Sequence, residues 1–134
     1  MGENTRDLAV RAEQRTRGLV PADAAWQNAT LVNGWVNYGA PYAPVSFRKD
    51  GWGFVHLRGL AKTGPAASVM FTLPAGYRPA AGDQQFIGVL ANGAMAFIEI
   101  GDSVAGGPAL GDVYSSAAGT SYVSLNGVTF LAGE

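Results

Sequence analysis

The strongest constraint on the fold is a change of pattern at Trp26. From this residue onward, apolar and polar residues alternate in short runs, and Gly, Pro, Asn and Asp separate the runs. Alternation with a period of two is typical of β-strands, and the separating residues are those that tight turns favour. Lys49-Asp50-Gly51 and Asn92-Gly93 predict tight hairpins, because glycine supplies the positive φ that such turns need. The runs predict eight strands, at residues 28–38, 44–49, 52–61, 68–73, 85–91, 94–100, 110–115 and 121–131. Eight short strands without a second helix predict an all-β domain over residues 21–134, a jelly-roll-like β-sandwich.

The first 20 residues follow a different pattern. They hold seven of the nineteen charged residues, which are 9 basic and 10 acidic. One stripe of side chains has helical spacing: Leu8, Ala12, Arg15 and Leu19. Gly18 and Pro21 then end the pattern. We therefore expect a short N-terminal helix over residues 1–20, either a frayed tail or the end of a coiled stalk that other chains complete.

Charged residues are scarce in the rest of the chain. Overall, 14% of residues are charged and 48% are hydrophobic, against about 25% charged in ordinary soluble domains. Some predicted strands are apolar on both faces, as where Phe54 and Leu60 lie opposite Val55 and Leu57. A domain of this size has little interior for strands buried on both sides. We therefore expect copies of the same chain to cover some of the outward faces.

The totals also exclude several classes of partner. A net charge of −1 and a pI near 5.7 provide no basic surface for nucleic acid or for an anionic membrane. Without cysteine there is no disulfide, thiolate zinc site or cysteine nucleophile. No stretch approaches the roughly 20 apolar residues of a membrane helix, and the first residues lack the apolar centre of a signal peptide. We expect no membrane insertion, and synthesis in a cytoplasm.

Few residues could carry catalysis. His56 is the single histidine and alternates with Phe54 and Arg58 on one face of a strand, where a packed or hydrogen-bonded role is expected. No Ser-His-Asp arrangement can be argued from spacing. Glu99 is a lone carboxylate on an apolar strand, with no second acid at a spacing that indicates a glycosidase pair. We therefore expect no enzymatic activity.

Asp102 and Asp112 lie in a glycine-rich connection where oxygen ligands for Ca²⁺ could gather. Aspartates beside glycines are more often turn residues. No metal or other cofactor is therefore expected.

The stretch FTLPAGYRP, residues 71–79, ends a strand abruptly. Pro74 lacks the N–H that a strand ladder needs, Gly76 suits a turn, and Pro79 stiffens the exit. The two prolines hold the connection so that Tyr77 can pack and Arg78 can reach a carbonyl or carboxylate across a strand or subunit boundary. A structural role is expected for both residues.

The same stretch resembles a signature of small C-terminal β-domains of bacteriophage tail fibres and related virion appendages. Three further segments support this resemblance, in the same order along the chain: LVNGWVNYG (31–39), YAPVSFRKDGWGFVHLRGL (42–60) and YVSLNGVTF (122–130). The resemblance implies a virion structural protein, made in a bacterial host, that forms a homotrimer. It also implies that the N-terminal segment joins the domain to other virion proteins, and that the domain attaches the virion to a host-surface glycan.

Two alternatives remain open: a purely architectural capsid or tail decoration or trimerisation domain, and an enzyme that degrades surface polysaccharide. Aromatic side chains stack on sugars but also fill small β cores, and packing in the core or an interface is expected for Trp35. In a simple up-and-down meander, four connections would lie at the end away from the stalk: 39–43, 62–67, 92–93 and 116–120. Receptor contact is then expected at Tyr42, Lys62, Asn92 and Thr120.

Overall fold

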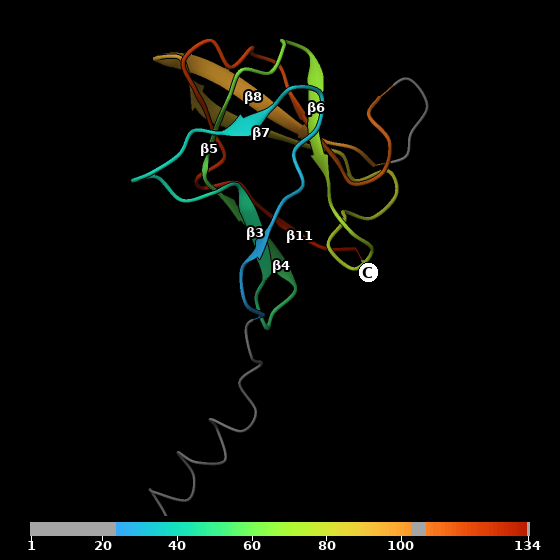
Figure 1. Cartoon of the computed structure of the whole chain (residues 1–134). Coiled ribbons are helices and arrows are strands. Elements are labelled where there is room, and N and C mark those ends of the chain that lie inside the picture. Colours follow the sequence, from blue (N-terminus) through green and yellow to red (C-terminus); the bar gives the residue numbers. More distant parts are fainter. Residues whose placement is uncertain (1–23, 103–106, 134) are drawn as a thin grey trace, which may run out of the picture.

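Two antiparallel sheets make up the computed structural model, which describes residues 24–102 and 107–133 (Figure 1). The strands are β1 (Gln27–Asn28), β2 (Val36–Asn37), β3 (Ser46–Lys49), β4 (Phe54–Arg58), β5 (Leu60–Lys62), β6 (Ser68–Thr72), β7 (Gln85–Ala91), β8 (Ala94–Ile100), β9 (Asp112–Ser115), β10 (Val123–Ser124) and β11 (Thr129–Leu131). One sheet has the order β1-β3-β4-β11. The other has the order β2-β5-β10-β7-β8-β9-β6 and curls into a half-barrel. The prediction of an all-β domain is confirmed.

The predicted helical segment over residues 1–20 lies outside the described residues. In the part of the chain that is described, all regular structure is β-strand. That part begins at Ala24, whose N–H donates to the carbonyl of Lys49 at 3.0 Å, beside the turn between β3 and β4. In Figure 1, β7 and β8 lie at the opposite end of the molecule.

Three of the eight predicted strands are wrong as single strands. Residues 28–38, 52–61 and 121–131 each divide between the two sheets, as β1 and β2, β4 and β5, and β10 and β11. A glycine with positive φ lies at each division: Gly34 at 84°, Gly59 at 109° and Gly127 at 87°. Such a φ suits glycine and interrupts an extended strand. The chain therefore crosses between the sheets repeatedly, and the simple meander is also wrong.

The other five predicted strands each contain one observed strand. The longest pair, β7 and β8, is joined by Asn92 and Gly93, whose φ angles of 52° and 80° match a two-residue hairpin turn. The predicted hairpin at this position is confirmed. The turn after β3 is longer than Lys49-Asp50-Gly51 suggests, because Gly53 rather than Gly51 has positive φ.

Side chains from both sheets meet in one core. Alternate residues of β4, Val55 and Leu57, point inward and are buried, as are Ile98 of β8 and Val113 of β9. Trp35 joins this core at 2% exposure. The structure thus places Trp35 in the core of a single chain.

The stretch after β6 behaves as its prolines and glycine indicate. The N–H of Tyr77 donates to the carbonyl of Pro74 at 3.1 Å, and Gly76 has a φ of 90°, so the chain makes a turn here. The Arg78 Nε donates to the carbonyl of Leu73 at 2.7 Å. Within the chain, Arg78 therefore reaches a carbonyl of its own connection.

Tyr77 links this turn to the four-stranded sheet. Its ring meets Phe47 edge-on with centroids 5.2 Å apart, and its hydroxyl accepts a hydrogen bond from Gln27 Nε2 at 2.8 Å. Both partners belong to strands of that sheet, β3 and β1. Within one chain, Tyr77 therefore fastens the connection that follows β6 to the neighbouring sheet.

Candidate functional site

A pocket of about 350 Å³ lies where the segment after β2 meets β5 and the segment before β10. It is lined by Tyr38, Tyr42, Leu60, Ser121 and Tyr122, and we call it the tyrosine pocket. Its walls come from β2, β5 and the segment before β10, which are neighbours in the larger sheet. Three tyrosines from separate parts of the chain therefore border one cavity.

Two of the tyrosine rings pack edge to face. The ring centroids of Tyr38 and Tyr42 are 5.2 Å apart with planes at 87°. The Lys62 ammonium lies over the Tyr38 ring, 5.1 Å from its centre, and makes a cation–π contact with it. Tyr42 remains 51% exposed. A ligand could therefore reach an aromatic ring and a nearby ammonium together.

Asn92 fixes the opposite wall. Its Oδ1 accepts hydrogen bonds from the N–H groups of Ser121 and Tyr122 at 2.7 and 2.9 Å, and its Nδ2 donates to the Ala118 carbonyl at 2.7 Å. The N–H of Gly93 donates to the Tyr122 hydroxyl at 3.2 Å. Asn92 is thus a positioning residue that ties the β7–β8 turn to the segment that carries Tyr122.

The four predicted receptor residues lie around this region. Tyr42 lines the tyrosine pocket, Lys62 lies over its Tyr38 ring, Asn92 holds its wall, and Thr120 is exposed beside Ser121. The connections gather because the chain crosses between sheets, which the meander argument did not foresee. Tyr38 and Tyr122 also line the pocket but were not predicted as contact residues. The sequence offered no signal for them beyond their being aromatic.

The pocket lining suits binding rather than bond cleavage. The residues that line it carry no carboxylate, imidazole or thiol. Tyrosine rings offer flat apolar faces with a hydroxyl at the edge, a combination that can stack on a sugar ring and hydrogen-bond its hydroxyls. The tyrosine pocket is therefore a candidate site for a neutral or weakly anionic glycan.

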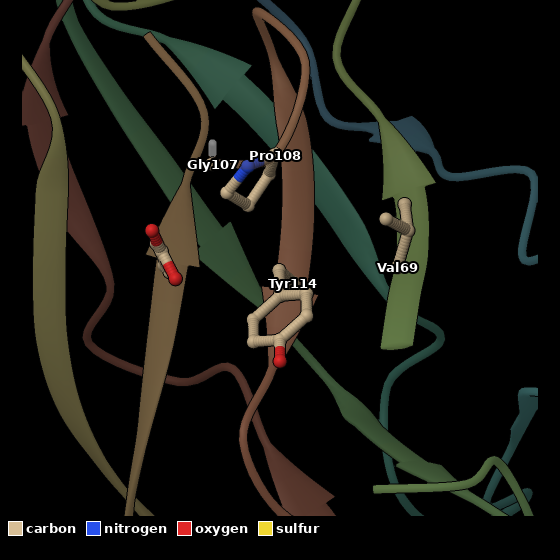
Figure 2. A pocket seen from close by; sticks show the side chains of 5 residues that line it. Val69, Gly107, Pro108 and Tyr114 are labelled. Carbon is tan, nitrogen blue, oxygen red and sulfur yellow. The ribbon is translucent and has the colours of Figure 1, made fainter. Parts of the chain in front are cut away.

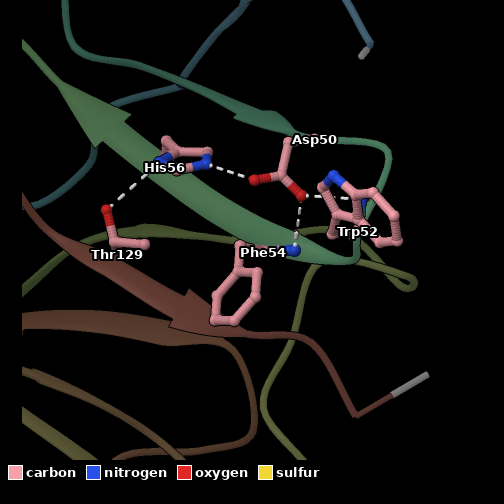
Figure 3. Close-up of polar contacts among 5 residues, drawn as sticks. All are labelled: Asp50, Trp52, Phe54, His56 and Thr129. Atoms are coloured by element: carbon pink, nitrogen blue, oxygen red, sulfur yellow. Dashed lines mark hydrogen bonds and ion pairs between the residues drawn. The ribbon is translucent and has the colours of Figure 1, made fainter. Parts of the chain in front are cut away.

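A second polar group lies on the outer face of the four-stranded sheet (Figure 3). The Nε2 of His56 is 2.8 Å from Asp50 Oδ2, and its Nδ1 is 3.1 Å from the Thr129 hydroxyl. The other Asp50 oxygen accepts hydrogen bonds from the N–H groups of Trp52 and Phe54 at 2.9 and 3.0 Å. Hydroxyl, imidazole and carboxylate follow one another as in a catalytic triad. Because they join β4, β11 and the β3–β4 turn, we interpret them as a brace.

Charge pairing within this brace predicts a pH effect. The hydrogen bond to His56 lowers the Asp50 pKa from its ordinary value of 3.8. A lowered folded-state pKa contributes stability above the unfolded value that is lost as pH falls through the folded value. We expect Asp50→Asn to melt at a lower temperature than the native chain at pH 7, and the difference to shrink as the pH falls below the ordinary Asp50 pKa of 3.8. Circular dichroism melts across this range check it, with the exposed Asp83→Asn as control. A difference that does not change with pH would contradict the role of the Asp50 charge.

The remaining predicted interface residues share that sheet face. Phe54 points outward with 41% exposure, which confirms that it alternates with the buried Val55. The Arg58 guanidinium lies 4.2 Å from the centre of the Trp26 ring, and its Nε donates to Ser46 Oγ at 2.9 Å. Arg48 approaches the same ring at 5.2 Å. Two guanidinium groups of this outer face therefore lie against the Trp26 indole.

Glu99 borders a second pocket, of about 340 Å³, with Val69, Gly107, Pro108 and Tyr114. Figure 2 shows the side chains of Val69, Pro108 and Tyr114 around it. Gln84 Nε2 donates to a Glu99 oxygen. One carboxylate among these lining residues does not supply the acid pair of a glycosidase.

The two aspartates of the glycine-rich connection are separate structural groups. Asp112 accepts a hydrogen bond from the Thr72 hydroxyl at 2.6 Å. Asp102 is buried, and its carbonyl accepts from the N–H of Gly82 at 3.3 Å. Across residues 24–102 and 107–133, no three His, Asp or Glu side chains gather as metal ligands would.

Comparison with known proteins adds no relative to this picture. No protein family, curated protein or solved structure matches the chain. Within the described residues, no helix has the length and apolar character to cross a membrane.

Proposed function

We propose that this chain is a non-enzymatic structural protein of a bacteriophage virion, a β-sandwich domain at the tip of a trimeric fibre or appendage that attaches to the host surface. Its four segments that resemble fibre-tip domains support the virion assignment. The tyrosine pocket supports attachment, and it is the single observation on which the proposed binding role depends. Weak contacts at each copy would be multiplied across a trimer.

A purely architectural role is the second candidate. The Asp50–His56–Thr129 brace and the packing of Tyr77 on Phe47 are structural devices, and they favour a rigid cap or decoration domain. Such a domain would need no ligand at the tyrosine pocket. Polysaccharide cleavage is the third candidate, and the lone carboxylate of Glu99 gives it the least support.

Replacing Tyr42 with alanine separates attachment from architecture. Tyr42 is half exposed at the pocket, and its removal takes away one stacking surface. Loss of an aromatic contact of about 1 kcal/mol at each site, repeated over three sites, lowers apparent affinity by about tenfold or more. Binding of the labelled full chain to a glycan array and to a panel of bacterial strains measures the change.

The matched control is Trp52→Ala. Trp52 is an aromatic residue with 71% exposure in the β3–β4 turn, and it does not line the tyrosine pocket. Attachment through the tyrosine pocket predicts that the Trp52 variant binds like the native chain while the Tyr42 variant does not. Native-like binding by the Tyr42 variant would contradict attachment through the tyrosine pocket, and absence of binding by the native chain would support the architectural role. Release of reducing sugars from capsule would instead support an enzyme.

A further inference from the structure

The outer face of the β7–β8 hairpin is apolar. Its outward positions alternate with buried residues and are Phe86, Gly88, Leu90, Met95, Phe97 and Glu99. Four of them are large apolar side chains with exposures of 62% for Phe86, 48% for Leu90, 77% for Met95 and 41% for Phe97. We call these four residues the hairpin patch.

The hairpin patch is ordered within one chain. The rings of Phe86 and Phe97 meet edge-on with centroids 5.9 Å apart. Leu90 and Met95 are directly opposite in the strand register. A Cβ added at Gly88 would lie 3.3 Å from the Met95 methyl carbon, so the Met95 side chain covers the glycine between Phe86 and Leu90. The four side chains thus form one continuous surface.

We propose that the hairpin patch is the contact surface for a second copy of this chain. At about 200 Å² for a large side chain, the exposed fractions leave on the order of 450 Å² of apolar area. The largest patch on a typical monomer is about 300–600 Å² and is often functional. A standard interface buries about 800 Å² per partner around a more apolar centre. The hairpin patch has the size of such a centre.

Charge favours this face over the outer face of the four-stranded sheet. That face carries the charged side chains of Arg48, Arg58 and Asp50, so an interface there would bury several charged groups. The outward positions of the hairpin include a single charged side chain, Glu99, at their margin. Identical copies can therefore approach through the hairpin patch with little repulsion.

Strand geometry favours contact between faces rather than between edges. At the β6 edge of the larger sheet, the Asn33 side chain donates to the Val69 carbonyl at 2.8 Å, and the N–H of Val32 donates to the Met70 carbonyl at 2.9 Å. The opposite edge is β2, which has only two residues. Both edges are poorly suited to pairing with another strand, so the copies would associate through the sheet face.

The inference rests on the proposed trimeric assembly and names the surface that builds it. The test is the mass of full-length Met95→Lys in solution by size exclusion with light scattering. Met95 is 77% exposed, and the control Trp52→Lys places the same charge at a side chain of 71% exposure outside the patch. We expect the native chain and the control to have about three times the chain mass of 13.9 kDa, and Met95→Lys to fall threefold to the single-chain value.

A second pair of variants tests whether a lower mass reflects lost association or lost folding. Phe97 in the hairpin patch is 41% exposed, and Val32 outside it is 42% exposed. Phe97→Lys should be monomeric with a native circular dichroism spectrum, and Val32→Lys should stay assembled. Native mass for folded Met95→Lys and Phe97→Lys would overturn the inference and leave residues 1–23 or another protein as the cover of this face. Glycan and cell binding by the Tyr42 variant tests attachment separately, so either idea can fail alone.

Discussion

Replacing Trp35 with alanine will lower the free energy of unfolding by about 3–5 kcal/mol. Its indole is buried at 2% exposure, and its Nε1 donates to Ser68 Oγ at 2.9 Å. The ring also occupies space left by two glycines, since a Cβ at Gly64 or Gly119 would lie 2.0 or 2.7 Å from it. A cavity of this size cannot collapse easily, because the facing positions already have no side chain. Chemical denaturation of the native and variant chains measures the change.

The control for this prediction is Trp52→Ala, which removes the same side chain from a position of 71% exposure. Surface substitutions usually change stability by less than about 0.5 kcal/mol. A loss below about 1 kcal/mol for Trp35→Ala would contradict the packing described for this core.

Replacing Gly59 with alanine will cost about 3 kcal/mol or more. Gly59 lies where the chain leaves β4 in one sheet and enters β5 in the other, with a φ of 109°. A Cβ there would lie 2.6 Å from the Pro44 carbonyl oxygen and 2.7 Å from the Val45 Cα. These are backbone atoms of a neighbouring segment of the same chain, so the two segments must separate before the methyl group fits.

Gly39→Ala isolates the steric part of this effect. Gly39 has nearly the same φ, 103°, but nothing lies within 4 Å of the Cβ it would gain. It should therefore show only the cost of the unfavourable φ, about 1–2 kcal/mol. Melting or denaturation curves compare the two variants, and equal losses would show that the close approach at Pro44 does not matter.

The strands with the clearest alternation could be predicted from sequence. Residues 85–91 and 94–100 form β7 and β8 as expected, and Asn92-Gly93 identified their turn. The stretch after β6 could also be interpreted, because proline restricts the backbone there and glycine permits the positive φ of a turn. These features depend only on residues that are close together in the sequence.

The sheet crossings could not be predicted in the same way. Residues 52–61 have a continuous strand pattern, and a glycine inside a strand is compatible with a bulge as well as a break. Only the close approach of Pro44 to Gly59 in three dimensions decides that the chain changes sheets there. For the same reason, the sequence did not show that residues 28–38 and 121–131 each contribute strands to both sheets.

The candidate sites depend on residues far apart in the chain. His56 and Thr129 are separated by 73 positions, so no local spacing could indicate their hydrogen bond. Tyr38 and Tyr122 meet at one pocket only because β2, β5 and β10 are neighbours. In β7, Phe86 and Leu90 alternate with the equally apolar Ile87 and Val89, so the sequence could not decide which pair faces outward.

The central claim is that the outward apolar surface of this chain is covered by identical copies. The most direct measurement is the mass of the native full-length chain in dilute solution, by light scattering coupled to size exclusion. The account predicts a mass of about three times 13.9 kDa that persists at micromolar concentration. A single species of 13.9 kDa under those conditions would contradict it.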